Sequence, residues 1–249
     1  GLEPETGDYQ FNKPIGVSVD GGGNIYIADG GNLRIQEHYS SPEDLPVFLP
    51  QYRDTFPGSA WGGVEYGAPA AVAVDRSGNM YVADSGNNNC IEVLAPNGTC
   101  VNSWGSEGSG GGRFFQPYGV AVHSSTNVHV AYTRHSRIEV FDPSGAYLRE
   151  FTSGGSGMNR LYWPVGLAIG PGPSGNVYVA DSFNNRIQKF DSTGSFITKW
   201  GSYGTEDGQF EQPYGVDADS AGNVYVTDAQ NHRVQKFNAT GSFITKWGS

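Results

Sequence analysis

The chain has 249 residues and a formal net charge of −10; 37% of its residues are hydrophobic, and it contains 37 glycines and 14 prolines. The hydrophobic fraction is low for a chain built around one thick core, and the composition favours many short strands joined by turns. The acidic balance argues against binding to a nucleic-acid backbone, which needs clustered Lys and Arg, and it gives no support for docking on an anionic membrane. Because no apolar run approaches the roughly 20 residues of a membrane span, we expect no membrane insertion.

A Pro-x-Gly or Pro-x-Ala motif followed by apolar residues returns five times, at intervals of 55, 48, 47 and 49 residues. The motifs begin at Pro14, Pro69, Pro117, Pro164 and Pro213. The spacing predicts one domain, residues 1–249, of five repeats: approximately 14–68, 69–116, 117–163, 164–212 and 213–249. Residues 1–13 resemble the loop at 201–210, so we expect them to complete a ring.

The fourth repeat shows the internal pattern most clearly. Strand-forming residues run from Pro164 to Ile169, Asn176 to Asp181, Arg186 to Phe190 and Ser195 to Trp200. The turn at Asp191–Gly194 predicts a positive φ at its glycine. A four-stranded meander that returns at this length predicts an all-β fold, a β-propeller of five four-stranded blades. In the first repeat, a longer insertion leaves Val47–Pro50 as the expected outer strand.

These residues resemble the NHL repeat family of β-propellers. The resemblance rests on PVGLAI, GNVYVADSFNNRIQKFD and FITKWGS in the fourth repeat, with weaker copies in all five. It implies the propeller fold but no single activity, because the family includes receptor sensor domains, RNA-binding regions and a metal-dependent peptide-amidating lyase. Most members that resemble this chain have six blades, so a six-bladed parent is the alternative to five.

In a propeller with the first strand of each blade nearest the axis, the loops between second and third strands share a face with the loops joining blades. The second strands end at this face with Asp29, Asp84, Tyr132, Asp181 and Asp228. Several carboxylates near one funnel could bind a cation or a sugar. Alternatively, each Asp accepts hydrogen bonds from the backbone of the turn that follows it. Recurrence in four repeats favours this structural role.

The loops joining blades add aromatic and basic residues to the same face. They are Arg113, Phe115, Tyr118, Arg160 and Trp163. Such rings can stack on sugars or hold peptide side chains, or they can wedge between blades. Trp61 and Tyr66 lie in the insertion of the first repeat, which has no counterpart elsewhere and is a candidate binding segment for that reason.

The lyase resemblance would place metal-binding histidines at the mouths of the inner strands. Those positions hold Ile15, Ala70, Tyr118, Val165 and Tyr214, so lyase activity is not supported. Asp217 replaces the small residue found at its position in the other repeats. A buried acid needs partners, which makes Asp217 the candidate ligand for Ca²⁺ or water in an axial channel. No other cofactor is expected.

Cys90 and Cys100 flank a turn between predicted strands. If Leu94 and Thr99 close that turn, Val93 lies opposite Cys100 and Ser103 opposite Cys90, which is poor registration for a disulfide. The two cysteines therefore do not decide whether the protein lies in an oxidising or a reducing compartment. The sequons Asn97-Gly98-Thr99 and Asn238-Ala239-Thr240 fall in turns of this kind and favour an extracellular or cell-surface protein.

Together these observations predict a non-catalytic binding or scaffold propeller with a protein or glycan partner. One alternative is a metal-dependent lyase or lactone hydrolase with its site in the central funnel. Another is a structural repeat domain within a larger chain or surface assembly, which the near-identity of the last two repeats favours.

Overall fold

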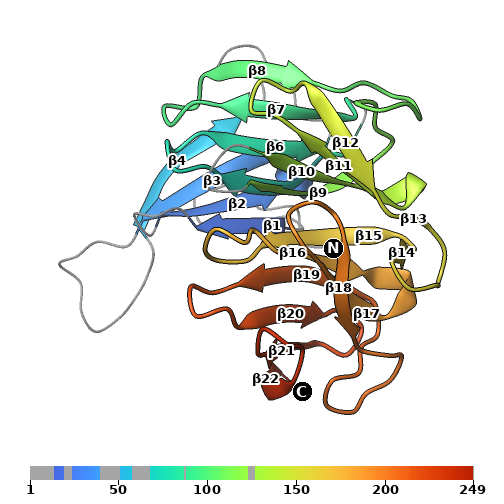
Figure 1. Ribbon diagram of the computed structural model, residues 1–249. Coiled ribbons are helices and arrows are strands. Elements are labelled where there is room, and N and C mark those ends of the chain that lie inside the picture. The colour runs from blue at the N-terminus through green and yellow to red at the C-terminus, as the bar shows by residue number, and fades with distance from the viewer. Residues whose placement is uncertain are drawn as a thin grey trace. The chain divides into compact units, whose positions relative to one another are not determined.

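The computed structural model describes residues 14–19, 24–39, 51–57, 68–86, 88–122 and 127–248. Strands and turns make up nearly all of this described part (Figure 1), and its helices are three short 3₁₀ turns, Gly30–Asn32, Thr133–His135 and Ser182–Asn184. None of these helices has the length or apolar character to cross a membrane. The chain divides into two compact units, residues 1–117 and 118–249.

The first unit contains two four-stranded antiparallel sheets whose strands pair in chain order. The first sheet is β1 (Pro14–Val19), β2 (Ile25–Asp29), β3 (Arg34–Tyr39) and β4 (Gln51–Pro57); the second is β5 (Pro69–Val74), β6 (Met80–Asp84), β7 (Cys90–Leu94) and β8 (Cys100–Trp104). Strands β1 and β2 both lie against β5. The core between the two sheets contains Tyr26, Ala28, Ile35, Val72, Met80, Val82 and Leu94.

The second unit contains three more sheets of the same order. They are β9 (Pro117–Val122), β10 (Val128–Tyr132), β11 (Arg137–Phe141) and β12 (Tyr147–Phe151); β15 (Pro164–Ile169), β16 (Val177–Asp181), β17 (Arg186–Phe190) and β18 (Phe196–Trp200); and β19 (Pro213–Ala218), β20 (Val224–Asp228), β21 (Arg233–Phe237) and β22 (Phe243–Gly248). A short parallel pair, β13 (Ser153–Gly154) and β14 (Arg160–Leu161), precedes β15. Strand β15 lies against both β10 and β19.

One four-stranded meander falls in each predicted repeat, so the β-propeller of five four-stranded blades is confirmed as the fold. The single domain over residues 1–249 stays a prediction, and residues 1–13 lie outside the described residues. The outer strand of the first sheet was predicted at Val47–Pro50 but is Gln51–Pro57, paired with Arg34–Tyr39. Because this is an edge strand, a terminal proline is tolerated there. The positive φ predicted for Gly194 is confirmed at 90°.

The middle strands of each sheet are the most deeply buried. Every residue of β16 and β17 is buried, whereas β18 alternates half-buried and exposed residues. The second sheet repeats this pattern in β6, β7 and β8. Two-sided burial suits strands rich in Val, Ile and Tyr, because these residues pack well on pleated surfaces.

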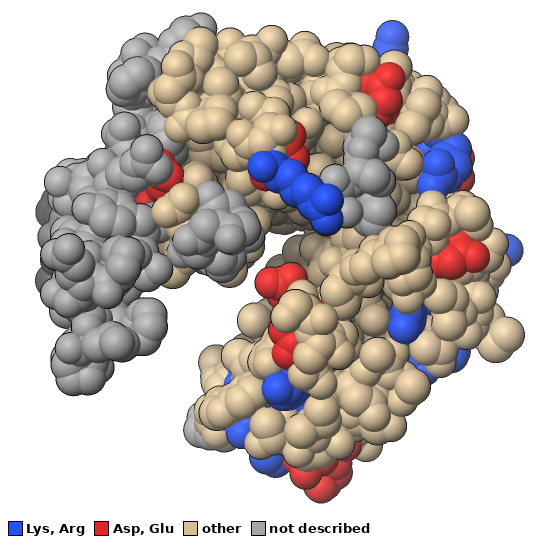
Figure 2. All heavy atoms as spheres, turned by 60° about the vertical axis from the view of Figure 1, so that its left-hand side comes forward, with Lys and Arg blue, Asp and Glu red and all other residues tan. Residues whose placement is uncertain are grey.

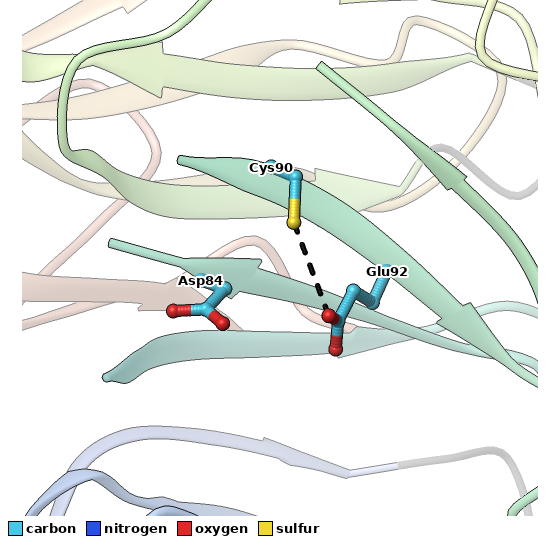
Figure 3. A group of neighbouring side chains, drawn as sticks. All are labelled: Asp84, Cys90 and Glu92. Atoms are coloured by element: carbon cyan, nitrogen blue, oxygen red, sulfur yellow. Dashed lines mark hydrogen bonds between the residues drawn. The ribbon is translucent and has the colours of Figure 1, made fainter. Parts of the chain in front are cut away.

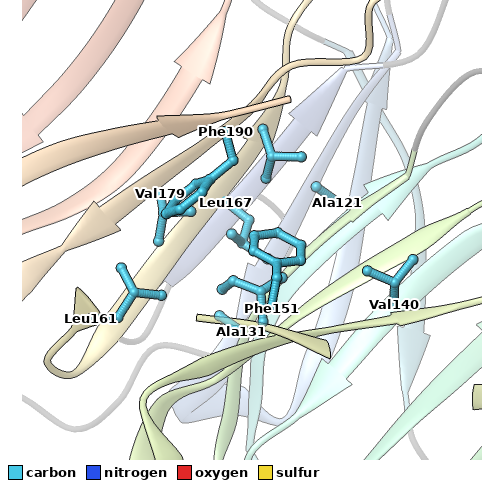
Figure 4. Packing of buried hydrophobic residues seen from close by; sticks show 10 residues of the cluster. Ala121, Ala131, Val140, Phe151, Leu161, Leu167, Val179 and Phe190 are labelled. Atoms are coloured by element: carbon cyan, nitrogen blue, oxygen red, sulfur yellow. The ribbon is translucent and has the colours of Figure 1, made fainter. Parts of the chain in front are cut away.

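The core between the sheets β9–β12 and β15–β18 shows how neighbouring blades bind each other. Phe151 and Phe190 meet with ring centroids 5.3 Å apart, and Leu161 and Leu167 pack beside them (Figure 4). Burying a side chain of this size contributes about 2–3 kcal/mol. These two blades of the second unit therefore share one core.

Glycine in the Pro-x-Gly motif is required where the first strands of neighbouring blades approach. A Cβ on Gly166 would collide with the backbone oxygen of Tyr214 in β19, and one on Gly119 would collide with that of Val165 in β15. A Cβ on Gly16 would lie 2.6 Å from Ala71 Cα. The motif therefore marks backbone-to-backbone contact between blades.

Gly166→Ala tests this contact. The added methyl group would push β15 away from β19, so we expect a loss of about 1–3 kcal/mol in the free energy of unfolding, or more because the obstacle is backbone. Urea unfolding followed by fluorescence measures the change. Gly110→Ala is the matched control, since nothing lies within 4 Å of a Cβ there. Equal stability of the two variants would contradict the interpretation.

Candidate functional site

The predicted aspartates at the ends of second strands are buried and bound by side chains of the same blade. Asp181 is fully buried. Its Oδ2 accepts hydrogen bonds from Arg186 Nε at 2.7 Å and Gln188 Nε2 at 2.9 Å. Its Oδ1 accepts one at 2.7 Å from the backbone N–H of Tyr162, in the loop that enters the sheet. Asn184 Nδ2 donates from the turn.

The same arrangement, here called the Asp–Arg–Gln network, occurs in two other sheets. In the last sheet, Asp228 Oδ2 accepts from Arg233 Nε at 2.8 Å and Gln235 Nε2 at 3.1 Å. In the first sheet, Asp29 Oδ2 accepts in the same way from Arg34 and Gln36, at 2.9 and 3.1 Å. The donors expected from the sequence were backbone groups of the following turn; the structure instead supplies mainly side chains three to seven residues further on.

The arginine of the network also holds the loop that joins two blades. Arg186 donates from its terminal nitrogens to the backbone oxygens of Ser156, Gly157 and Arg160, at 3.1, 2.9 and 2.7 Å. Arg233 donates in the same manner to Thr205, Glu206 and Gln209. The carboxylate neutralises a cation that binds three carbonyl groups of the loop between blades, which is a structural role.

In the third sheet a tyrosine, an arginine and a glutamate take the positions of the network's aspartate, arginine and glutamine. Tyr132 stands at the aspartate position and is fully buried. The Arg137 guanidinium lies 4.9 Å from the centroid of the Tyr132 ring and forms an ion pair with Glu139 at 2.6 Å. Arg137 also pairs with the more exposed Glu150 at 3.2 Å. A buried acid and an arginine are therefore still paired, with the ring adding a cation–π contact.

The second sheet keeps the aspartate but changes both partners. Cys90 pairs with Asp84 across the strands, in the register in which Arg186 pairs with Asp181, and Glu92 occupies the glutamine position. Figure 3 shows the side chains of Asp84, Cys90 and Glu92 close together. Burial and the charge of Asp84 raise the pKa of Glu92 to about 8. Burial and the neighbouring carboxylates raise the pKa of Cys90 to about 12. Ionising this cluster is therefore costly.

An exposed aromatic cluster forms where β14 leads into β15. Trp163 stacks on Phe183 with ring centroids 5.3 Å apart and an interplanar angle of 10°. Tyr162 meets the edge of Phe183, also at 5.3 Å. The Arg134 guanidinium lies 6.0 Å from the Trp163 ring. Tyr162, Trp163, Phe183 and Arg134 are called the aromatic cluster below.

The other predicted face residues are not part of this cluster. Arg160 is exposed and donates to the backbone oxygen of Gly154 at 3.2 Å. Arg113 is exposed, and Phe115 and Tyr118 are partly buried. The predicted binding residues Trp61 and Tyr66 lie outside the described residues. Figure 2 shows, on one face, that described Lys and Arg side chains are scattered among uncharged residues.

The structure also places the predicted metal and thiol candidates. Asp217 is exposed on β19, and its carboxylate accepts a hydrogen bond from the N–H of Ala218 at 2.8 Å; Ca²⁺ binding there stays a prediction.

Cys90 and Cys100 are free thiols. A bulge between Val93 and Leu94 pairs Cys100 with Leu94 rather than with the predicted Val93, and places Ser103 opposite Glu92.

Sequence reasoning missed Arg and Gln in the network and Phe183 in the aromatic cluster. The signal for the first was present, because Asp, Arg and Gln recur at fixed spacing in Asp29-Arg34-Gln36, Asp181-Arg186-Gln188 and Asp228-Arg233-Gln235. The turn after Asp84 contains one residue more than the turn after Asp181, which hides the equivalence of Cys90 and Arg186. Phe183 gave no periodic signal, since it occurs in one repeat only.

Arg186→Met tests the structural role of the network. Removing the guanidinium leaves Asp181 charged and buried without its cation, so we expect a loss of about 3–5 kcal/mol in the free energy of unfolding. Chemical denaturation measures it. The control is Lys246→Met, which removes an exposed ion pair with Asp207 and should cost less than about 1 kcal/mol. A small loss for both variants would contradict this role.

Comparison with known proteins gives partial sequence relatives and extensive structural ones. Over 122 residues the chain is 30% identical to peptidylglycine alpha-amidating monooxygenase of Rattus norvegicus, a match covering 47% of this chain and 12% of that protein. A chain of a nidogen/laminin complex aligns with a TM-score of 0.70 at 19% identity, covering 95% of this chain and 80% of that one. A streptogramin B lyase aligns at 0.63 and 14% identity, with coverages of 94% and 68%. Identities this low show the fold alone.

The NHL repeat model matches residues 11–37, 161–190 and 210–237. Each matched segment contains one complete Asp–Arg–Gln network, whereas the second and third sheets, which replace its members, lie outside these matches. The repeat model thus follows the same residues that hold the loops between blades. Three of the five four-stranded blades thus contain a match to the NHL repeat model, which is consistent with an NHL-repeat β-propeller.

Proposed function

We propose that this propeller is a non-catalytic binding module that recognises a protein partner through the aromatic cluster. The supporting observation is that two large rings of the cluster remain exposed, Tyr162 by 51% and Phe183 by 41%. Phe183 is oriented by stacking on Trp163, and Tyr162 by its edge contact with Phe183. Rings presented rigidly in this way lose little conformational entropy on binding, and Trp, Tyr and Arg are the residues most enriched in binding hot spots.

The backbone beneath the cluster supports the same proposal. Trp163 has a φ of 59°, and the equivalent residues before the third and fifth blades are Gln116 and Gln212, with φ of 57° and 51°. The left-handed conformation is therefore a property of the fold, but a bulky indole in it is uncommon. Phe183 likewise stands where the neighbouring repeats have Arg134 and Gln230. Two unusual aromatic residues meet at one point, which packing common to all blades does not require.

The rival functions have weaker support. A nidogen/laminin complex among the structural relatives makes protein recognition compatible with this fold. A lyase among the structural relatives makes catalysis compatible with the fold as well. The positions at the mouths of the inner strands carry no histidine, however; they hold Ile15, Ala70, Tyr118, Val165 and Tyr214. Recognition of a glycan by the same rings is an outcome that the binding experiment distinguishes.

Selection of a peptide library on the immobilised chain, with a glycan array in parallel, tests the proposal. We expect enriched peptides whose affinity falls at least about tenfold in Tyr162→Ala and Phe183→Ser, because each loses a hot-spot ring. Tyr203→Ala is the matched control, since Tyr203 is 68% exposed in the next blade-joining loop and its loss should leave binding unchanged. Enrichment on the glycan array alone, or equal binding by all variants, would overturn it.

We propose an extracellular or cell-surface location on the basis of the two sequons. Asn97 is exposed in the turn between β7 and β8, and Asn238 is partly buried in the turn between β21 and β22. Surface labelling and fractionation of the native source should recover the chain in the surface or secreted fraction. Peptide N-glycosidase should lower its mass. Recovery only from the cell interior, with Asn97 and Asn238 unmodified, would contradict this location.

A further inference from the structure

The cluster of Asp84, Cys90 and Glu92 is the place where the repeating network loses its positive charge. In the first, fourth and fifth sheets the aspartate faces an arginine and a neutral amide. In the second sheet the arginine is replaced by a thiol and the amide by another carboxyl group. Both substitutions introduce residues that ligate metals, and they occur at the two positions that hold the arginine and the amide partner of the aspartate in the other blades.

Burial makes this arrangement unfavourable without a cation. Asp84 is fully buried and Glu92 is 4% exposed. The Glu92 Oε2 atom is buried and has no hydrogen-bond partner. A buried carboxyl oxygen left unpaired costs about 1–3 kcal/mol or more. The equivalent Gln188 Oε1 is also buried without a partner, but its Nε2 donates to Asp181; Glu92 has no such donor, so its carboxylate can only add negative charge beside Asp84.

The donor atoms are already close enough for one ion to gather them. One ligand atom from each of the three side chains lies within 4.8 Å of the other two, and Cys90 Sγ is 3.9 Å from Glu92 Oε1. Tetrahedral Zn²⁺ with bonds of about 2.0–2.3 Å separates its ligands by about 3.3–3.8 Å. Asp84 is held through Oδ1 by the N–H groups of Ala68 and Gly86 and through Oδ2 by Asn88 Nδ2 at 2.8 Å. Metal binding therefore requires Cys90 and Glu92 to rotate toward Asp84 and Asn88 to release its Oδ2.

The donor set selects the metal. Thiolate sulfur is a soft ligand that suits Zn²⁺ and not Ca²⁺ or Mg²⁺, which take oxygen ligands in larger numbers. Three protein ligands leave a fourth tetrahedral position for water. We propose that Asp84, Cys90 and Glu92 form a Zn²⁺ site in which the metal ion replaces the buried arginine of the other blades.

The role of this site is structural and independent of the aromatic cluster. On binding, the Cys90 thiol and the Glu92 carboxyl group each release a proton to solvent as the Zn–S and Zn–O bonds form. The ion then links β6 to β7 at the point where Arg186 links β16 to β17. The site belongs to the first unit and the aromatic cluster to the second, so either proposal can fail without the other.

Titration of the EDTA-treated, fully reduced chain with Co²⁺ and then Zn²⁺ tests the proposal. One equivalent of Co²⁺ should produce a thiolate-to-cobalt charge-transfer band, which Zn²⁺ abolishes by displacement. Zn²⁺ should raise the Tm by several degrees, because only the folded chain gathers the three ligands. Cys100→Ala is the matched control, since Cys100 Sγ hydrogen-bonds to the backbone oxygen of Asn102; it should keep the band and the Tm shift.

Three further variants complete the test. Cys90→Ala should lose the charge-transfer band, and Glu92→Gln should weaken Co²⁺ binding by about tenfold or more. Because Cys90→Ala can also destabilise the fold, the double variant Cys90→Arg/Glu92→Gln restores the network of the sister blades. It should fold without metal and show no Tm shift with Zn²⁺. The proposal is overturned if the native chain gives no band at one equivalent, if the band survives in Cys90→Ala, or if the double variant responds to Zn²⁺.

Discussion

The buried pair of an aspartate and an arginine is the interaction on which this chain depends. The arginine satisfies carbonyl groups of the loop between blades, and the aspartate neutralises the arginine. Neither is stable in the interior alone, since an unpaired buried charge costs several kcal/mol. The pair therefore couples the middle strands of one blade to the path of the chain entering it. The two blades that lack it hold other combinations of charge at the same positions.

Much of the fold was predictable from the sequence, because period and turn chemistry are local. The Pro-x-Gly motif and the Asp191–Gly194 turn fix strand starts and ends with no reference to distant residues. Register near Cys100 was predicted wrongly, since a bulge depends on packing across two strands. The position of strand β4 was also predicted wrongly, because the inserted segment contains no periodic pattern that shows which of its residues pair with β3.

The candidate sites were less predictable than the fold. Aspartate was recognised as the recurring residue, but its partners lie on the following strand, and only a register alignment brings Arg186 or Cys90 opposite it. Trp163 was identified, whereas Phe183 was not, because their contact joins residues 20 positions apart through a turn. Departures from a repeat are therefore more informative when they are compared at structurally equivalent positions than when they are compared along the chain.

The glycine at which neighbouring first strands touch has a consequence for how such a chain can change. Because the spacing there is set by main-chain atoms of Gly166 and Tyr214, it does not depend on which side chains decorate the loops. New copies of the unit can be added and old ones can diverge while the joint between them stays the same. Ligand specificity can thus change through one loop at a time while the contacts between blades stay the same.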